Sequence, residues 1–282
     1  MTKALLIIPA IDLSDGHCAR CVLGEPGTEN LYRGMSNNPV QMAQLWRREN
    51  AKCIHVRDND SFSGADNTAS VKAAIAMQQA VDIPIQFVSL QYDSVVLRHL
   101  LDSGVYRVAV NALIVTDPEE VHRLVADYGN NRVALGIRAE NGFVHFRDMA
   151  SVEDQQLIRQ AYALGIRRVI YGEKKWEGAL AGQDPAVIER VASAAPARYT
   201  MAGGIANSEQ LWELQRIAPQ NVDSVVIGRA LYENRFPCQQ IWRSAEAVLE
   251  PDLQNQLEDG RQSSISKLDK TAGTQRSDQP PT

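Results

Sequence analysis

Glycines that follow two apolar runs are the first candidates for chemistry in this sequence. Residues 199–202 are followed by a Gly-Gly pair, and residues 225–227 by Gly-Arg. Glycine lets the backbone approach a ligand closely, and the N–H groups at the start of a helix suit an anion. We therefore predict a phosphate site in these turns, although two tight turns without a ligand are the simpler alternative. The residues assigned to the phosphate are Ala202, Gly203, Gly204, Gly228 and Arg229.

Two carboxylates near the start of the chain follow apolar runs in the same way. Asp12 closes the first run, and Asp58 follows the second. In α/β barrels the catalytic groups lie at the carboxyl ends of the strands, so we predict that Asp12 is catalytic. The alternative for Asp12 is a loop cap. Asp58 either contacts the ligand or holds the turn at Asn59.

The elements that must position these residues alternate along the chain. From residue 4 to about residue 249, short β-branched runs alternate with amphipathic stretches, which is typical of βα units around a parallel sheet. The pattern gives about eight units and predicts a (β/α)8 TIM barrel. The expected strands are 4–12, 53–57, 83–88, 106–110, 132–138, 167–171 and the two runs before the glycine turns.

Similar features recur in the two halves of the sequence. Asp12 and Arg138 end the first and fifth expected strands, and Asn111 and Gly228 end the fourth and eighth. This spacing predicts two similar half-barrels. We expect one barrel domain over residues 1–249, closed by a helix that begins at Pro237. The polar segment 250–282 is expected to be disordered and outside the fold.

Composition excludes several classes of function. The chain has 282 residues, 44% of them hydrophobic, and a net charge of -5, so neither nucleic acid nor a membrane is the expected partner. No apolar run reaches the roughly 18 residues of a membrane span, and a cytoplasmic location follows by default. We expect a monomer. The pair Cys18 and Cys21 lacks a second close pair of ligands, so no metal and no other cofactor is predicted.

Several of these motifs resemble one known family. Residues 8–13 read Ile-Pro-Ala-Ile-Asp-Leu with Gly16 after them, and His55, Asp58 and Asp60 fall where a second-strand motif belongs. Together with 202–205 and 228–233, this resembles the ProFAR isomerases of histidine biosynthesis (phosphoribosylformimino-aminoimidazole carboxamide ribotide isomerases). The resemblance implies an Amadori-type aldose–ketose isomerisation of a phosphorylated aminoribose that carries two phosphates.

The resemblance also implies site residues, and here the sequence departs from the family. The family takes one catalytic carboxylate from strand one, which matches Asp12 as the base, and one from strand five, where this chain has Arg138. Arginine stays protonated and cannot exchange protons as a carboxyl does. Glu140, two residues on, is expected to replace it as the acid if the loop bends inward, and a water is the alternative. Arg138 itself is expected to contact the substrate, as is Glu173, which falls where the family has an acidic residue.

The first half of the chain has also lost a phosphate loop that the resemblance implies. Where the family has glycine-rich turns after strands three and four, this chain reads Val-Ser-Leu-Gln-Tyr over 88–92 and Asn-Ala-Leu over 111–113. Three hypotheses therefore stand. The chain is a divergent isomerase, or it is a non-isomerising paralogue that binds a phosphorylated metabolite in a regulatory or scaffold role. A lyase or synthase that acts on a related phosphate ranks below these two.

Overall fold

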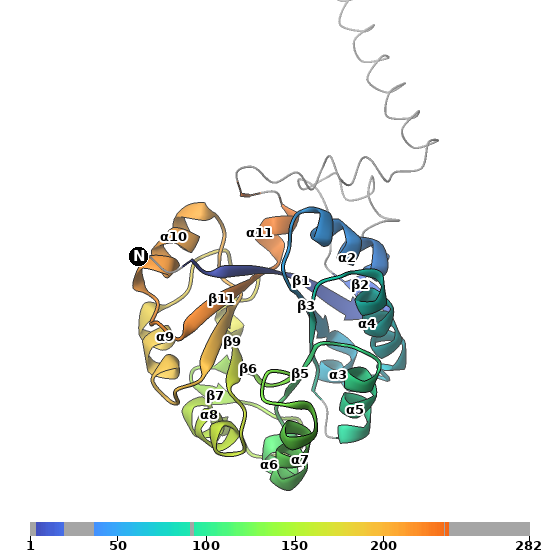
Figure 1. Cartoon of the computed structure of the whole chain (residues 1–282). Coiled ribbons are helices and arrows are strands. Elements are labelled where there is room, and N and C mark those ends of the chain that lie inside the picture. Colours follow the sequence, from blue (N-terminus) through green and yellow to red (C-terminus); the bar gives the residue numbers. More distant parts are fainter. Residues whose placement is uncertain (1–3, 20–36, 91–92, 234, 237–282) are drawn as a thin grey trace, which may run out of the picture.

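A closed barrel of parallel strands forms the centre of the molecule. The computed structural model describes residues 4–19, 37–90, 93–233 and 235–236. Eight parallel strands form the ring, and the pairing of β5 with β6 closes it (Figure 1). The predicted (β/α)8 barrel is confirmed. Around the ring the strands are β1 (Leu6–Ser14), β3 (Ile54–Asp58), β4 (Ile85–Val88), β5 (Arg107–Val110), β6 (Val133–Glu140), β9 (Arg168–Glu173), β10 (Arg198–Ala202) and β11 (Val222–Ile227).

Helices cover the outside of the ring (Figure 1). The long ones are α2 (Pro39–Arg48), α4 (Thr68–Ala80), α5 (Ser94–Asp102), α7 (Pro118–Tyr128), α8 (Asp154–Ala163), α9 (Pro185–Ala192) and α10 (Ser208–Ile217). Four short helices follow strands β3, β5, β9 and β11 at their carboxyl ends. They are α3 (Asn59–Ser63), α6 (Leu113–Thr116), η2 (Lys174–Trp176) and α11 (Arg229–Tyr232).

Local sequence explains where the long helices begin and which face they bury. In α2, Asn38 caps the first turn by accepting from the amides of Val40 and Gln41, and proline occupies the first helical position. The apolar stripe of α2, which includes Leu45 and Trp46, is buried. Asn207 caps α10, because its side chain accepts from the amide of Gln210.

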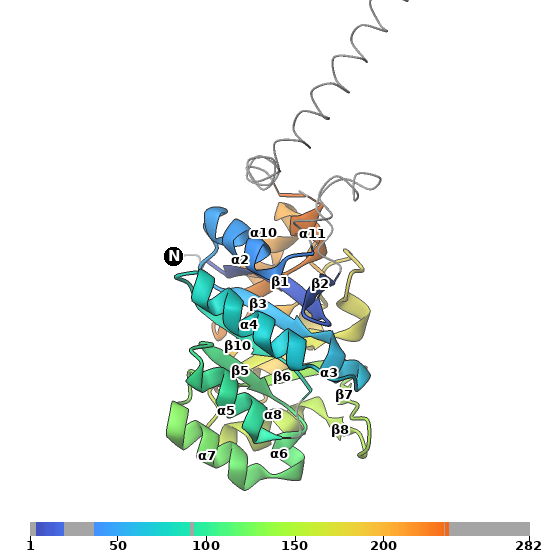
Figure 2. The same cartoon turned by 90° about the vertical axis from the view of Figure 1, so that its right-hand side faces the viewer.

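Two matching hairpins support the predicted relation between the half-barrels. β1 continues into β2 (His17–Ala19) through a two-residue turn at Asp15-Gly16, and β6 continues into β7 (Phe143–Val144) through Asn141-Gly142. All four turn residues have positive φ, as tight hairpin turns require. A short β8 (Val152–Glu153) extends the second hairpin. In Figure 2 both hairpins lie at the same end of the barrel.

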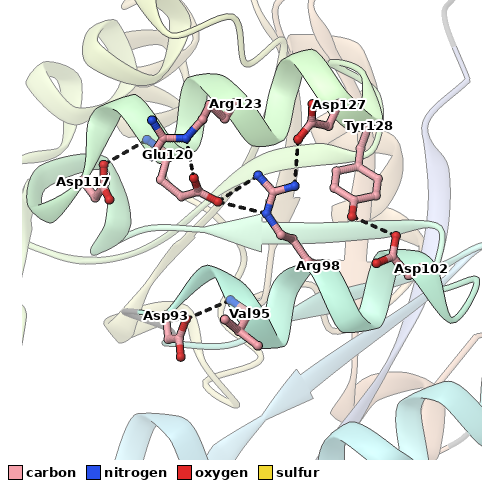
Figure 3. A network of polar contacts seen from close by, with 9 residues as sticks. All are labelled: Asp93, Val95, Arg98, Asp102, Asp117, Glu120, Arg123, Asp127 and Tyr128. Carbon is pink, nitrogen blue, oxygen red and sulfur yellow. Dashed lines mark hydrogen bonds and ion pairs between the residues drawn. The ribbon is translucent and has the colours of Figure 1, made fainter.

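Ion pairs join the outer surfaces of α5 and α7. Arg98 binds Glu120 at 2.9 Å and Asp127 at 2.7 Å, and Arg123 binds the other oxygen of Glu120 at 2.7 Å (Figure 3). The hydroxyl of Tyr128 donates to Asp102 at 2.8 Å. Desolvation raises the pKa of Glu120, but hydrogen bonds led by the one from Arg123 outweigh it and lower that pKa to about 2. These contacts lie outside the barrel and hold the helices in place.

Small side chains and aliphatic side chains fill the inside of the barrel. One layer contains Ile8, Cys53 and Val226, and a second contains Val88, Ala109, Ala134 and Ile170. Cys18 is buried in β2, whereas the predicted closing helix, the segment 250–282 and Cys21 lie outside the described residues. Within the described part of the chain, no group of three His, Cys, Asp or Glu residues could hold a metal ion, and no helix is long and apolar enough to span a membrane.

Candidate functional site

One large cavity opens at the carboxyl ends of the barrel strands. Its volume is about 1260 Å³, above the roughly 300–1,000 Å³ of most small-molecule sites. Every one of the eight strands contributes a lining residue from its end or from the position directly after it. This is the end of the barrel where (β/α)8 enzymes bind their substrates. The cavity suits a ligand larger than a single sugar phosphate.

Asp12 lines this cavity, as predicted from its place at the end of the first strand. It lies on β1 beside Arg57 of β3 in the parallel register. The following hairpin is anchored by the buried carboxylate of Asp60, which accepts from the hydroxyl of Ser14 at 2.9 Å and from the amide of Asp15 at 2.8 Å. Asp60 therefore holds the end of the strand that carries Asp12.

The predicted phosphate turns also line the cavity. Gly203 and Gly204 both have φ of +86°, which a residue with a side chain rarely adopts. A Cβ on Gly204 would approach the carbonyl oxygen of Gly182 to 2.7 Å, so only glycine fits there. All five residues assigned to the phosphate, Ala202, Gly203, Gly204, Gly228 and Arg229, are brought together at the cavity wall.

The direction of the peptide groups in the Gly-Gly turn decides which amides are available. The amide of Gly203 donates to the carbonyl of Val226 at 3.1 Å. The carbonyls of Gly203 and Gly204 accept from the side chain of Gln183 at 2.6 Å and from the amide of Gly182 at 2.9 Å. In a trans peptide the next N–H points opposite to the carbonyl. The amides of Gly204 and Ile205 therefore point away from the loop at 182–183.

Gly228 and Arg229 begin the short helix α11. The carbonyl of Gly228 accepts from the amide of Leu231 at 2.9 Å, which starts the helical turn. The guanidinium of Arg229 is paired with Glu233 and also donates to the carbonyl of Gly178 at 3.1 Å. Arg229 is thus a cation at the cavity wall with part of its donor set already engaged.

Arg138 lines the cavity in an ion pair that the sequence did not suggest. Its Nε and Nη2 donate to the two oxygens of Glu177 at 2.6 and 2.9 Å. The same carboxylate accepts from Nη1 of Arg57 at 3.2 Å. The hairpin comparison makes Arg138 the counterpart of Asp12, because each lies three residues before its two-residue turn. The hydrogen bond to Glu177 raises the pKa of Arg138, which fixes a positive charge at this position.

Glu140 lines the cavity at the end of β6, but a neighbour holds it as a carboxylate. Nζ of Lys174 donates to it at 3.0 Å. This hydrogen bond lowers the pKa of Glu140, so the carboxyl is ionised at neutral pH.

Asp58 and Glu173 are not among the residues that line the cavity. Asp58 is fully buried and caps α3 by accepting from the amides of Asp60 and Ser61, and Asn67 donates to its second oxygen at 2.6 Å. Desolvation raises the pKa of Asp58. Glu173 lies behind the strand, where the hydroxyl of Tyr171 binds it at 2.8 Å. The structure thus gives both carboxyls contacts within the fold, away from the cavity.

A chain of buried hydrogen bonds ends at His55, to which the sequence motif assigned no role in the site. Nη1 of Arg107 donates to Oε1 of Gln86 at 3.1 Å, and Nε2 of Gln86 therefore faces Nδ1 of His55 at 3.0 Å as the donor. This assigns the ring proton to Nε2 of His55. Burial, together with the charge of Arg57, lowers the pKa of His55 to about 3. His55 lines the cavity as a neutral hydrogen-bond donor.

The fold and the position of the cavity define a (β/α)8-barrel protein that binds its ligand at the carboxyl ends of the strands. Comparison with family models identifies the family. The model described as "Histidine biosynthesis protein" matches residues 6–237, and the chain belongs to this family.

Curated relatives align with most of the chain. A protein of Chlorobium phaeovibrioides is 35% identical over 246 residues, which are 86% of this chain and 94% of the relative. A protein of Chlorobium chlorochromatii is 35% identical over 88% of this chain and 96% of its own length. A protein of Chloroherpeton thalassium is 33% identical over 93% of this chain and its own full length. All three are named 1-(5-phosphoribosyl)-5-((5-phosphoribosylamino)methylideneamino)imidazole-4-carboxamide isomerase.

Proposed function

We propose that this protein is an isomerase of histidine biosynthesis that acts on the substrate in its relatives' names. That substrate carries two phosphoribosyl groups. The observation that supports the proposal best is the meeting of Asp12 and both glycine turns in one large cavity. The non-isomerising alternative is not favoured, because relatives named as isomerases align over 94% or more of their own length.

In the proposed reaction the glycine turns hold one phosphate of the substrate. The amides of Gly204 and Ile205 and the guanidinium of Arg229 supply donors and positive charge at that end of the cavity. Asp12 is the base that removes the proton from C2 of the aminoribose. The acid that opens the ribose ring is assigned to Glu140, to which Nζ of Lys174 donates at 3.0 Å. His55 adds a neutral N–H donor to the same cavity.

An assay with the bisphosphorylated substrate tests this function. We expect the full chain to form the ketose product, and Asp12→Asn to lower kcat by about 10²- to 10⁴-fold, the usual contribution of a positioned acid or base. Asp15→Asn is the matched control, since Asp15 is an exposed carboxylate of the adjacent turn and does not line the cavity. The proposal fails when the parent chain shows no turnover, or when Asp12→Asn matches the parent.

Three further expectations stay predictions about the whole protein. They are a cytoplasmic location, a monomeric state and the absence of a nucleic-acid partner. Cell fractionation tests the first, and sedimentation of the purified chain tests the second. Titration with labelled DNA and RNA at low salt tests the third, because a phosphate-backbone interaction is strongest there.

A further inference from the structure

The backbone amides at the ends of β4 and β5 are already occupied by side chains. The hydroxyl of Ser61 accepts from the amide of Leu90 at 2.9 Å. The side-chain oxygen of Asn111 accepts from the amide of Ala112 at 2.6 Å. These two positions are where the family resemblance implies a second backbone cradle for phosphate. In this chain both N–H groups donate hydrogen bonds to side chains of the protein itself.

Arginine side chains occupy the same half of the mouth. Arg57, Arg138 and Arg147 all line the cavity. The guanidinium of Arg57 lies over the ring of Phe62, 5.0 Å from its centroid. Nη2 of Arg147 donates to the carbonyls of Ser61 at 3.2 Å and of Phe62 at 3.4 Å. Arg57 and Arg147 therefore both contact the short helix α3, and Glu177 connects Arg57 to Arg138.

The charges of this arginine group are not balanced by the carboxylate within it. Arg57 and Arg138 share the carboxylate of Glu177, whereas Arg147 donates to backbone carbonyls, so these four side chains together carry two excess positive charges. Arg57 uses a single nitrogen, Nη1, in its pair with Glu177. Guanidinium groups present several N–H donors in a planar fork that matches the oxygens of a phosphate. A phosphate dianion would neutralise the excess charge.

We infer that Arg57, Arg138 and Arg147 bind the second phosphate of the substrate through their guanidinium groups, in place of the backbone amides at the ends of β4 and β5. This inference rests on the proposed function, since it assigns a binding group for the same bisphosphorylated substrate. This chain then recognises the two phosphates by different means. One phosphate is bound by backbone N–H groups of the glycine turns together with Arg229, and the other by side-chain cations alone.

Calorimetric titration in the Asp12→Asn background tests the inference without turnover. The probes are the bisphosphorylated substrate and its two monophosphates, each lacking one of the phosphates. In that background, Arg57→Gln and Arg138→Gln are each expected to weaken binding of the bisphosphate by about 10- to 100-fold, the usual effect of losing a charge-assisted hydrogen bond. Binding of one monophosphate should weaken equally, and binding of the other should stay unchanged.

Two further variants separate a specific site from a general charge or folding effect. Arg57→Lys keeps the charge but loses the planar fork, so we expect its affinity to fall between that of the Asp12→Asn background and that of Arg57→Gln. Arg123→Gln removes an arginine from the outer surface of α7 and should leave every affinity unchanged. Thermal melting checks that each variant is folded.

The outcomes distinguish this inference from the proposed function. The inferred arginine site is refuted if the glutamine variants bind both monophosphates equally more weakly. It is also refuted if both variants bind the bisphosphate with unchanged affinity. Turnover by the parent chain is measured separately. An inactive parent whose selective phosphate binding depends on Arg57 and Arg138 would support the binding site and refute the isomerase assignment.

Discussion

Gly203 and Gly204 show how single residues constrain the proposed phosphate turn. Both have φ of +86°, a backbone conformation that glycine adopts readily and other residues rarely adopt. The two positions differ in how much space an added Cβ would have. A Cβ on Gly204 would meet a backbone oxygen, whereas a Cβ on Gly203 finds its nearest neighbours at 3.6 Å. Gly203 can therefore carry a side chain without a steric clash, although its backbone would be strained.

This difference makes Gly203→Asp a test of the phosphate turn. An added carboxylate at the cavity wall would repel a phosphate, so we expect at least about 10-fold weaker binding of the monophosphate that occupies the glycine turns, by calorimetry. Gly129→Asp is the control for backbone strain, because Gly129 has φ of +89°, has open space around it and lies outside the cavity. Equal affinity in Gly203→Asp and the parent would remove the turn from the site.

Sequence reasoning could reach some site residues and not others. Asp12 and the glycine turns were predictable because each lies at the end of an apolar run, which fixes its place at one end of the barrel. The role of Glu177 was not predictable, because its partners Arg57 and Arg138 lie 120 and 39 residues away in the chain. Asp58 and Glu173 follow strands too, but local capping and the alternation of side chains turn them away from the cavity.

At the scale of elements, the ion pairs between α5 and α7 make stability depend on pH. Glu120 is largely buried and accepts from both Arg98 and Arg123. Its pKa is lowered from 4.5 to about 2 in the folded state. The folded chain therefore binds this proton less readily than the unfolded chain does. The stabilisation is fully present above pH 4.5 and is lost as the pH falls towards 2.

We expect Glu120→Gln to lower the free energy of unfolding by about 1–2 kcal/mol at pH 7, after allowance for solvent screening around the exposed arginines. The difference from the parent should shrink as the pH falls from 4.5 to about 2. Urea denaturation across this range measures it. Glu119→Gln changes an exposed neighbour in the same helical turn and should shift stability by less than about 0.5 kcal/mol. A decrease in the free energy of unfolding that stays the same at every pH would contradict the ion-pair explanation.

The strands and long helices were largely predictable, because hydrophobic period and caps are local properties. The second strand was expected over 53–57 and lies at Ile54–Asp58. The short helices at the barrel mouth were not predicted. α3 and η2 contain few residues, and α3 depends on a buried cap at Asp58 whose partner Asn67 comes nine residues later. Such contacts form only after the barrel brings the loops together.

At the scale of the whole molecule, one tyrosine connects the last described helix to the first strand. The hydroxyl of Tyr232 in α11 donates to the carbonyl of Ala10 at 2.7 Å and accepts from the indole N–H of Trp46 at 3.2 Å. It thereby joins α11, β1 and α2 beside the seam where β1 pairs with β11. Closure of the barrel depends on contacts between residues that lie as far apart in the chain as Ala10 and Tyr232.

Tyr232→Phe removes this hydroxyl, so the buried indole N–H of Trp46 and the part-buried carbonyl of Ala10 lose a hydrogen-bond partner. We expect the free energy of unfolding to fall by about 1–3 kcal/mol, the usual cost of an unsatisfied buried donor or acceptor. Urea denaturation measures the change. Tyr106→Phe alters an exposed tyrosine directly before β5 and should be close to neutral. Unchanged stability in Tyr232→Phe would show that water replaces the hydroxyl.

The occupied amides of Leu90 and Ala112 have a consequence for how a ligand enters. In a barrel whose halves matched, a molecule with a phosphate at each end could bind in two opposite orientations. Here the two ends of the mouth differ, so the forward and reversed orientations differ in free energy. A difference of about 1.4 kcal/mol is enough for a ten-to-one preference. The loss of symmetry would then direct C2 of the sugar towards Asp12 in nearly every bound complex.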